Sequence, residues 1–165
     1  MMPFSLEDQS FVLRPLVQAD VAKYQVFFND LSVESVRCRF GHLLAKLTET
    51  EAARRTDGNT DGETAVAILD EPQQRIVAVG RCYLDGHGAQ AEVALVVAEP
   101  LRRLGLGRVL LAQLIEVARN QKARSISAYI ATQNAPVLRL LQSAGFVRQS
   151  AGHEDDLKLV LNVSP

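Results

Sequence analysis

The 165-residue sequence contains no tryptophan, few aromatic residues and two cysteines. Cys38 and Cys82 lie far apart and outside any Cys-x-x-Cys spacing, which excludes a disulfide framework and a cysteine zinc site. We expect both to be reduced thiols, with Cys82 a core residue of an apolar segment rather than a nucleophile. The three histidines, His42, His87 and His153, are scattered without the spacing of metal ligands, so no metal is expected.

Long apolar runs and an excess of one charge are also missing. The 18 Lys and Arg residues nearly balance the 19 Asp and Glu residues, which argues against a general nucleic-acid backbone binder. No apolar run approaches the roughly 18 residues of a membrane span, and the first ten residues have no apolar core of a signal peptide. We therefore expect a cytoplasmic chain without nucleic-acid or membrane partners, folded as a single domain over residues 1–165.

Residue patterns along the chain predict an α/β (α+β) domain with a mixed sheet of six or seven strands and helices on both faces. A helix is expected to follow Asp20, and two short ones to lie between Ser32 and Thr56, with Thr48 and Glu51 as a capping box. The predicted strands are residues 11–13, 64–70, 75–85, 91–98, 125–131, 146–150 and 157–162. Helices at 107–121 and 135–144 separate the last strands, so 91–98 and 125–131 should be parallel neighbours.

The segment "AEPLRRLGLGRVLLAQL", residues 98–114, joins a buried strand to a helix. The first N–H groups of a helix lack internal partners and carry the positive end of its dipole. Gly105 and Gly107 would let an anion approach those amides closely. The arginines that would add to this positive field are Arg102, Arg103 and Arg108. The alternative is a glycine-rich connector that binds nothing.

Two other phosphate-binding loops fit this segment poorly. A Rossmann loop requires a third glycine where Leu110 stands, and the Gly-Lys-Ser/Thr of a P-loop is absent. Instead, Arg102, Gly105 and Gly107 fill the R/Q-x-x-G-x-G/A signature, so the segment resembles the acetyl-CoA loop of the GNAT superfamily of N-acetyltransferases. The later stretch "NAPVLRLLQSAGF" is similar to a second GNAT motif, with Asn134 opening a helix and Gly145 closing it. The opening "FVLRPL...AD" is also typical of that superfamily.

The resemblance implies a sheet that splays apart between residues 91–98 and 125–131. It implies acetyl-CoA (coenzyme A) as co-substrate, with its pantetheine arm along the exposed strand edge and its pyrophosphate in the glycine loop. A strand N–H would then act as oxyanion donor to the thioester. The cofactor-binding residues implied are Leu95, Val96, Val97, Arg102, Arg103, Leu104, Gly105, Leu106, Gly107, Arg108 and Asn134.

Glu92 is a carboxylate inside the otherwise apolar run "AEVALVV", where an unpaired charge is costly to bury. By alternation it shares a face with Ala94 and Val96. An alkylamine of pKa about 10.4 needs a base before it can attack. The alternative is that Glu92 is the solvated start of the strand. The run resembles the fourth strand of GNAT protein-lysine acetyltransferases, which implies that Glu92 is the catalytic base.

The acceptor is less closely defined. "LSVESVRCRFGH" with the later "KLT" resembles bacterial Pat-type protein acetyltransferases, although Val36 or Arg37 replaces their tyrosine and their regulatory domain is absent from this sequence. The expected reaction is acetyl transfer to a primary amine, with a protein lysine or a small molecule as acceptor. A non-catalytic acyl-CoA sensing module and a homodimer are left open. No Cys or Ser nucleophile is placed beside a base, so direct transfer is expected.

Groups that would assist this chemistry are few. Leu141 stands where many GNAT enzymes have a tyrosine that protonates the departing thiolate, and Tyr129 is a weak substitute that we expect to be a core residue of its strand. The arginines that could line an acceptor site, or else be solvated helix faces, are Arg37, Arg39, Arg54 and Arg55.

Overall fold

The computed structural model describes residues 1–40, 46–57, 62–86, 89–149 and 156–163. Within these residues one sheet has the strand order β1-β2-β3-β4-β5-β6-β8-β7. Neighbouring strands are antiparallel except β5 and β6, which are parallel as predicted. The strands are β1 (Met2–Leu6), β2 (Gln9–Pro15), β3 (Glu63–Asp70), β4 (Arg75–Leu84), β5 (Gln90–Val97), β6 (Ser125–Ala131), β7 (Val147–Gln149) and β8 (Asp156–Asn162).

The sheet therefore has eight strands within the described ranges, where the sequence predicted six or seven. The strand that sequence reasoning missed is β1, which pairs with β2 at the edge of the sheet. It contains Pro3 and is mostly exposed, and an edge strand tolerates proline because half of its backbone pairs with nothing. Glu7 and Asp8 form its hairpin turn, with φ of 46° and 63°. Turns of this conformation usually have the sequence Asn-Gly or Asp-Gly, which is absent here.

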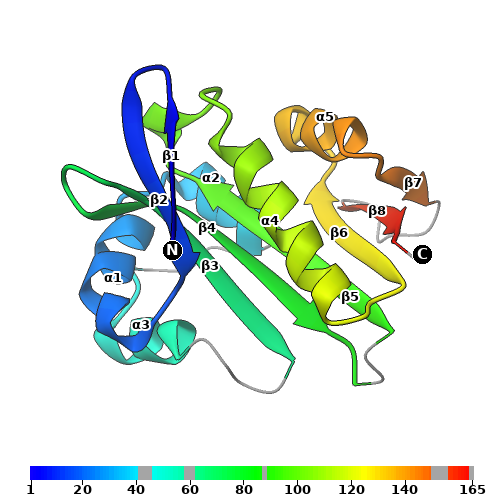
Figure 1. Ribbon diagram of the computed structural model, residues 1–165, viewed down its shortest axis with the longest axis horizontal. Coiled ribbons are helices and arrows are strands. Elements are labelled where there is room, and N and C mark those ends of the chain that lie inside the picture. The colour runs from blue at the N-terminus through cyan, green and yellow to red at the C-terminus, as the bar shows by residue number, and fades with distance from the viewer. Residues whose placement is uncertain (41–45, 58–61, 87–88, 150–155, 164–165) are drawn as a thin grey trace.

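Helices cover both faces of the sheet, as predicted, with α4 across the near face and α2 behind it (Figure 1). A first apolar cluster joins the sheet to α4 and α5, and a second joins it to α1, α2 and α3. β3 supplies both, because Ile68 belongs to the first cluster and Leu69 to the second. The helices are η1 (Gln18–Asp20), α1 (Val21–Asn29), α2 (Val33–Phe40), α3 (Glu49–Thr56), η2 (Glu99–Leu101), α4 (Leu106–Asn120) and α5 (Ala135–Ser143).

Local signals place several helix ends. Thr48 and Glu51 form the predicted capping box of α3, with each backbone N–H bonded to the other side chain. Ser32 caps α2, since its Oγ accepts from the Ser35 N–H at 3.1 Å. Arg14 and Asp20 from the "FVLRPL...AD" segment pair through two bonds of 2.6 and 2.7 Å, which tie the end of β2 to η1. None of the helices in the described ranges is long and apolar enough to cross a membrane.

Gly80 sets how closely α4 approaches the sheet. A Cβ added at Gly80 would lie 2.9 Å from Leu114 Cδ1 and 3.0 Å from Leu110 Cγ, closer than carbon atoms pack. The absence of a side chain therefore lets α4 lie directly on β4. Because α4 follows β5 through a short connection, this contact also fixes where the N-terminus of α4 meets the end of β5.

Candidate active site

β5 and β6 separate after three paired positions. Gln90, Ala91 and Glu92 pair with 125–127, and the register ends there although both strands continue. Figure 1 shows the separation of the two strands and the segment that connects β5 to α4. The splayed centre implied by the family resemblance is thus present, and Glu92 lies at its closed end.

Hydrogen bonds at the two ends of β5 show which backbone groups face this gap. The Ala98 N–H donates to the Val77 carbonyl at 2.9 Å, and the Asp85 N–H donates to the Gln90 carbonyl at 2.8 Å. In an antiparallel pair such bonded positions alternate. Even-numbered residues of β5 therefore bond to β4, and odd-numbered ones turn toward β6. The Ala91 carbonyl fits this assignment, because it accepts from Ser127 Oγ on β6.

The predicted cofactor edge, Leu95 to Val97, divides accordingly. Leu95 turns its backbone N–H and carbonyl into the gap, as does Val93 nearer the closed end. Val97 does so too, but its carbonyl already accepts from Arg102 Nε at 3.0 Å. The backbone of Val96 pairs with Val79 of β4, so Val96 contributes its side chain, which packs against the second apolar cluster.

The loop after β5 presents backbone amides at the start of α4. Arg103 and Gly105 adopt left-handed conformations, with φ of 72° and 97°, and Gly105 is the N-cap of α4. No side chain caps this helix, and the N–H groups of Arg108 and Val109 both return to the Gly105 carbonyl, at 3.0 and 3.2 Å. The amides of Leu106 and Gly107 come earlier and have no carbonyl within the helix to bond. This end of α4 is therefore suited to hold an anion.

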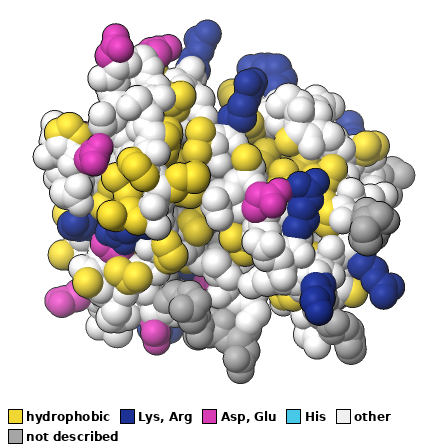
Figure 2. Space-filling view, viewed as in Figure 1, with side chains coloured by type: hydrophobic (Ala, Val, Ile, Leu, Met, Phe, Trp, Pro, Cys, Tyr) yellow, Lys and Arg dark blue, Asp and Glu magenta, His cyan; other side chains and the backbone are white. Residues whose placement is uncertain are grey.

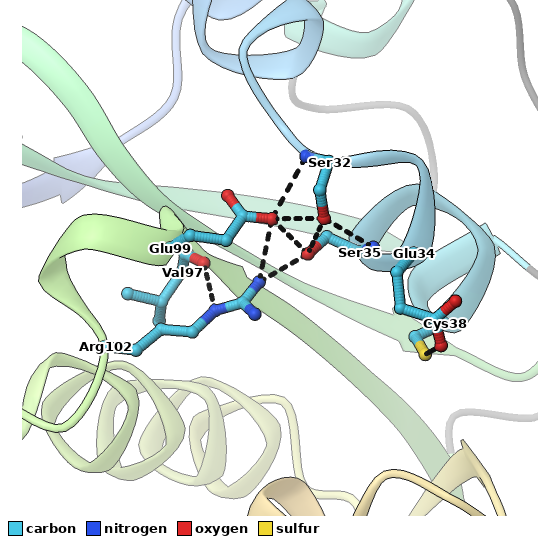
Figure 3. A network of polar contacts seen from close by, with 7 residues as sticks. All are labelled: Ser32, Glu34, Ser35, Cys38, Val97, Glu99 and Arg102. Atoms are coloured by element: carbon cyan, nitrogen blue, oxygen red, sulfur yellow. Dashed lines mark hydrogen bonds and ion pairs between the residues drawn. The ribbon is translucent and has the colours of Figure 1, made fainter.

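The three loop arginines do different things. Lys and Arg side chains gather along the top of the face shown in Figure 2, above the N-terminus of α4 in the same view. Arg103 and Arg108 are exposed and can contribute to that field. Arg102 instead turns toward α2, where it takes part in a polar network with Glu99, Ser32 and Ser35 (Figure 3).

Glu99 is the centre of this network. Its Oε1 accepts from the Ser32 N–H at 3.0 Å, from Ser32 Oγ at 2.7 Å and from Ser35 Oγ, and lies 3.4 Å from Arg102 Nη2. Partial burial acts to raise the pKa of Glu99, but the hydrogen bonds from Ser35 and Ser32 outweigh it and lower the pKa from 4.5 to about 2. The network therefore ties the N-terminus of α2 to the signature arginine of the glycine loop.

We expect Glu99→Gln to raise the Kd for acetyl-CoA about three- to tenfold, the usual size of a hydrogen bond or two. Loss of the carboxylate leaves Arg102 without its anionic partner, so the loop is held less firmly. Titration calorimetry measures the effect, and Glu116→Gln, which removes the exposed partner of Arg119 on α4, is the matched control. Equal affinities in the two variants would contradict a role of Glu99 in holding the loop.

Glu92 is exposed and lies in a row of side chains across the sheet. It pairs with Tyr83 on β4 and with Ser127 on β6. Neighbours paired in this way project from the same face, which here is the face covered elsewhere by α1, α2 and α3. The carboxylate is thus both accessible and at the closed end of the gap.

Asn134 caps α5, because its Oδ1 accepts from the Val137 N–H at 3.4 Å. This capping role leaves Nδ2 as the group that could donate to a cofactor. Leu141 is 2% exposed and packs in the first apolar cluster, so it offers no acid. Cys82 is buried and free, as predicted, and burial raises the pKa of its thiol to about 11.

Tyr129 differs from its prediction as a core residue, since 48% of it is exposed and Lys158 Nζ lies 5.5 Å from its ring centre. The outward alternation of β6 explains this, because Ala128 and Ile130 supply the core instead. His42, His87 and His153 lie outside the described residues. Within the described ranges no group of His, Cys, Asp and Glu side chains could hold a metal ion.

Sequence reasoning missed Arg81, which is 4% exposed in β4. It pairs with Glu63 of β3, donates to the Arg55 carbonyl and lies over the Tyr24 ring at 5.8 Å. An arginine in the middle of the apolar run "IVAVGRCYL" was a usable signal, because a buried charge needs partners. Arg81 and Tyr83 line a pocket together with α3, on the face that carries Glu92.

Comparison with known proteins agrees with this architecture. Residues 29–146 match the acetyltransferase (GNAT) family. Acetyltransferase PA5475 of Pseudomonas aeruginosa is 29% identical over 151 residues, which cover 88% of this chain and 80% of that protein.

Two solved structures share the fold. The GNAT domain of S. lividans PAT has a TM-score of 0.87 at 21% identity, over 98% of this chain and 96% of that one. YncA from Salmonella typhimurium, a structure with acetyl-CoA, has a TM-score of 0.74 at 20% identity, over 93% and 94%. The family match spans both the glycine loop and the Asn134 motif, and this chain therefore belongs to the acetyltransferase (GNAT) family.

Proposed function

We propose that the protein transfers an acetyl group from acetyl-CoA directly to a primary amine. One observation carries the proposal: β5 leads from Glu92, past the gap-facing backbone of Leu95, straight into the amide-presenting loop at Gly105. From Glu92 to Val97 the strand rises by about 17 Å. A base, an open strand edge and an anion cradle thus lie in one line, as an extended thioester with a pyrophosphate at its far end requires.

The residues present fit acetyl-CoA. The amides of Leu106 and Gly107, with Arg103 and Arg108 nearby, would hold the pyrophosphate. The gap-facing backbone groups of β5 would hold the pantetheine arm, beside Asn134 Nδ2. Acetyl-CoA supplies an activated acyl group whose leaving group is a thiolate.

In this proposal the protein's residues accept one proton from the acceptor ammonium and stabilise the negative charge that develops on the thioester oxygen. Glu92, directly or through a water, takes a proton from the acceptor ammonium so that the amine can attack. A gap-facing N–H of Val93 or Leu95 stabilises the oxyanion. A thiol of pKa roughly 8.5 leaves readily as its thiolate, which can take up the second proton that the nitrogen loses on forming the amide, so the reaction does not require an acid at Leu141.

Release of CoA across a panel of amines tests the proposal. The panel holds a lysine peptide, spermidine, amino acids and simple alkylamines, and mass spectrometry identifies the acylated product. We expect turnover with at least one class, which then decides between a protein lysine and a small molecule. Tight binding of acetyl-CoA with no turnover on any amine would contradict the proposal and indicate a sensing module, which the buried Leu141 would suit.

A further inference from the structure

A polar pocket of about 260 Å³ adjoins Glu92 on the same face of the sheet. Its lining comes from α3, β3 and β4. Tyr83 belongs to this lining and is the cross-strand partner of Glu92, so the pocket begins one strand away from the proposed base. The lining residues are Glu51, Arg54, Arg55, Glu63, Arg81 and Tyr83.

Part of this charge is already neutralised within the protein. Arg81 is buried, pairs with Glu63 and has its remaining contacts on the Arg55 carbonyl and Tyr24. Glu51 is engaged in the capping box, where hydrogen bonds from Thr48 lower its pKa, so it is ionised but serves the start of α3. Arg81, Glu63 and Glu51 therefore line the pocket with side chains that are held by partners within the protein.

In the part of the chain that the structure describes, arginines outnumber carboxylates at this pocket. Arg54 and Arg55 of α3 both line the pocket, and Arg39 of α2 contacts Tyr83 beside it. Burial lowers the pKa of Arg39, and repulsion from Arg81 contributes to the decrease, so cations are crowded here. Arg54 is exposed, and its charge acts electrostatically on Glu51. Among the described residues, three guanidiniums and two carboxylates thus line the pocket, and the guanidinium of Arg39 lies beside it.

We propose that this pocket binds a carboxylate of the acceptor, so that the substrate is a small amino acid or another short amine bearing a carboxylate. The inference rests on the proposed function, because the ammonium of such a molecule is placed at Glu92. Guanidinium groups bind carboxylates through paired, charge-assisted hydrogen bonds. A polyamine or a lysine in a basic segment meets repulsion at the same place. A protein lysine with an acidic neighbour would also bring a carboxylate, so the test must distinguish it from a small amino acid.

Matched pairs of amines test the requirement for a carboxylate. Phenylalanine is compared with phenethylamine, and leucine with isoamylamine, by CoA release at saturating acetyl-CoA, with spermidine and a lysine peptide alongside. We expect kcat/KM to be about ten- to a hundredfold higher for each amino acid than for its decarboxylated partner. Equal values within the pairs, or a preference for spermidine or the peptide, would overturn the inference while leaving acetyl transfer intact.

Variants on α3 locate the effect. Arg54→Gln and Arg55→Gln should lower kcat/KM for phenylalanine about tenfold or more and leave phenethylamine and the acetyl-CoA affinity unchanged. Arg119→Gln on α4, which removes an exposed cation far from the pocket lining, is the matched control. Equal losses with both members of a pair would show that the arginines only support the fold.

A measurement of phenylalanine binding distinguishes failure of this inference from failure of the proposed function. If no amine is turned over, calorimetry of phenylalanine with the CoA-bound protein decides. Binding that is lost in Arg54→Gln supports the pocket although the catalytic proposal fails, whereas no binding overturns both.

Discussion

Glu92→Gln should lower kcat by about 10² to 10⁴ at pH 7 while the affinity for acetyl-CoA stays unchanged. Glutamine keeps the size and most of the hydrogen bonding of glutamate but cannot accept the proton. Glu92 is exposed and lies at the end of the β5–β6 pairing, so the substitution removes no buried contact. Steady-state CoA release gives kcat, and calorimetry gives the affinity.

The pH profile distinguishes a lost base from a disturbed site. The deficit of Glu92→Gln should shrink as pH rises toward the pKa of the acceptor amine, because free amine then forms without a base. Glu116→Gln on the exposed side of α4 should behave as the unmodified protein. Near-normal turnover of Glu92→Gln at pH 7 would show that the proton goes to water or to another group.

Gly107→Glu should abolish measurable binding of acetyl-CoA at concentrations that saturate the unmodified protein. The substitution places a negative charge at the second residue of α4, where phosphate oxygens should meet backbone amides. A Cβ at this position would lie 3.2 Å from Leu140 Cδ2, a flexible methyl that can shift, and 3.9 Å from Val97. Calorimetry measures the affinity, and circular dichroism measures the fold.

Gly107→Ala is the matched control, because it adds the same Cβ without the charge. It should keep the affinity within about tenfold, since the crowding involves one movable methyl group. Arg108→Glu places a similar charge one residue later on an exposed position and should also weaken binding. Unchanged affinity in a folded Gly107→Glu protein would mean that the loop is a simple connector.

Local patterns account for the parts of the fold that the sequence predicted well. The valine-rich run of β5, the glycine loop, the periodic face of α4 and the Gly145 end of α5 each depend on neighbours within a few residues. The parallel pairing of β5 with β6 follows from the helix between them. β1 escaped prediction because its turn lacks glycine and asparagine and its strand lies at an edge.

The missed parts of the site depend on contacts between distant segments. The sequence placed Arg102 in the loop expected to hold the cofactor, and no local pattern indicated that its guanidinium also contacts Glu99 and Ser35, the latter 67 residues earlier in the chain. The pocket likewise joins α3 to β4, and the sequence left open whether Arg54 and Arg55 line an acceptor site or are solvated helix faces. Nothing in a local pattern says which distant residue will neutralise a charge.

A single-turnover measurement with the protein in excess over acetyl-CoA tests the central claim most directly. Free CoA and acylated amine are counted together, in the presence and absence of an accepted amine. The account predicts equal amounts of the two products when amine is present and no CoA release without it. A burst of CoA without amine, together with acetylated protein, would contradict direct transfer and require a nucleophile in the chain.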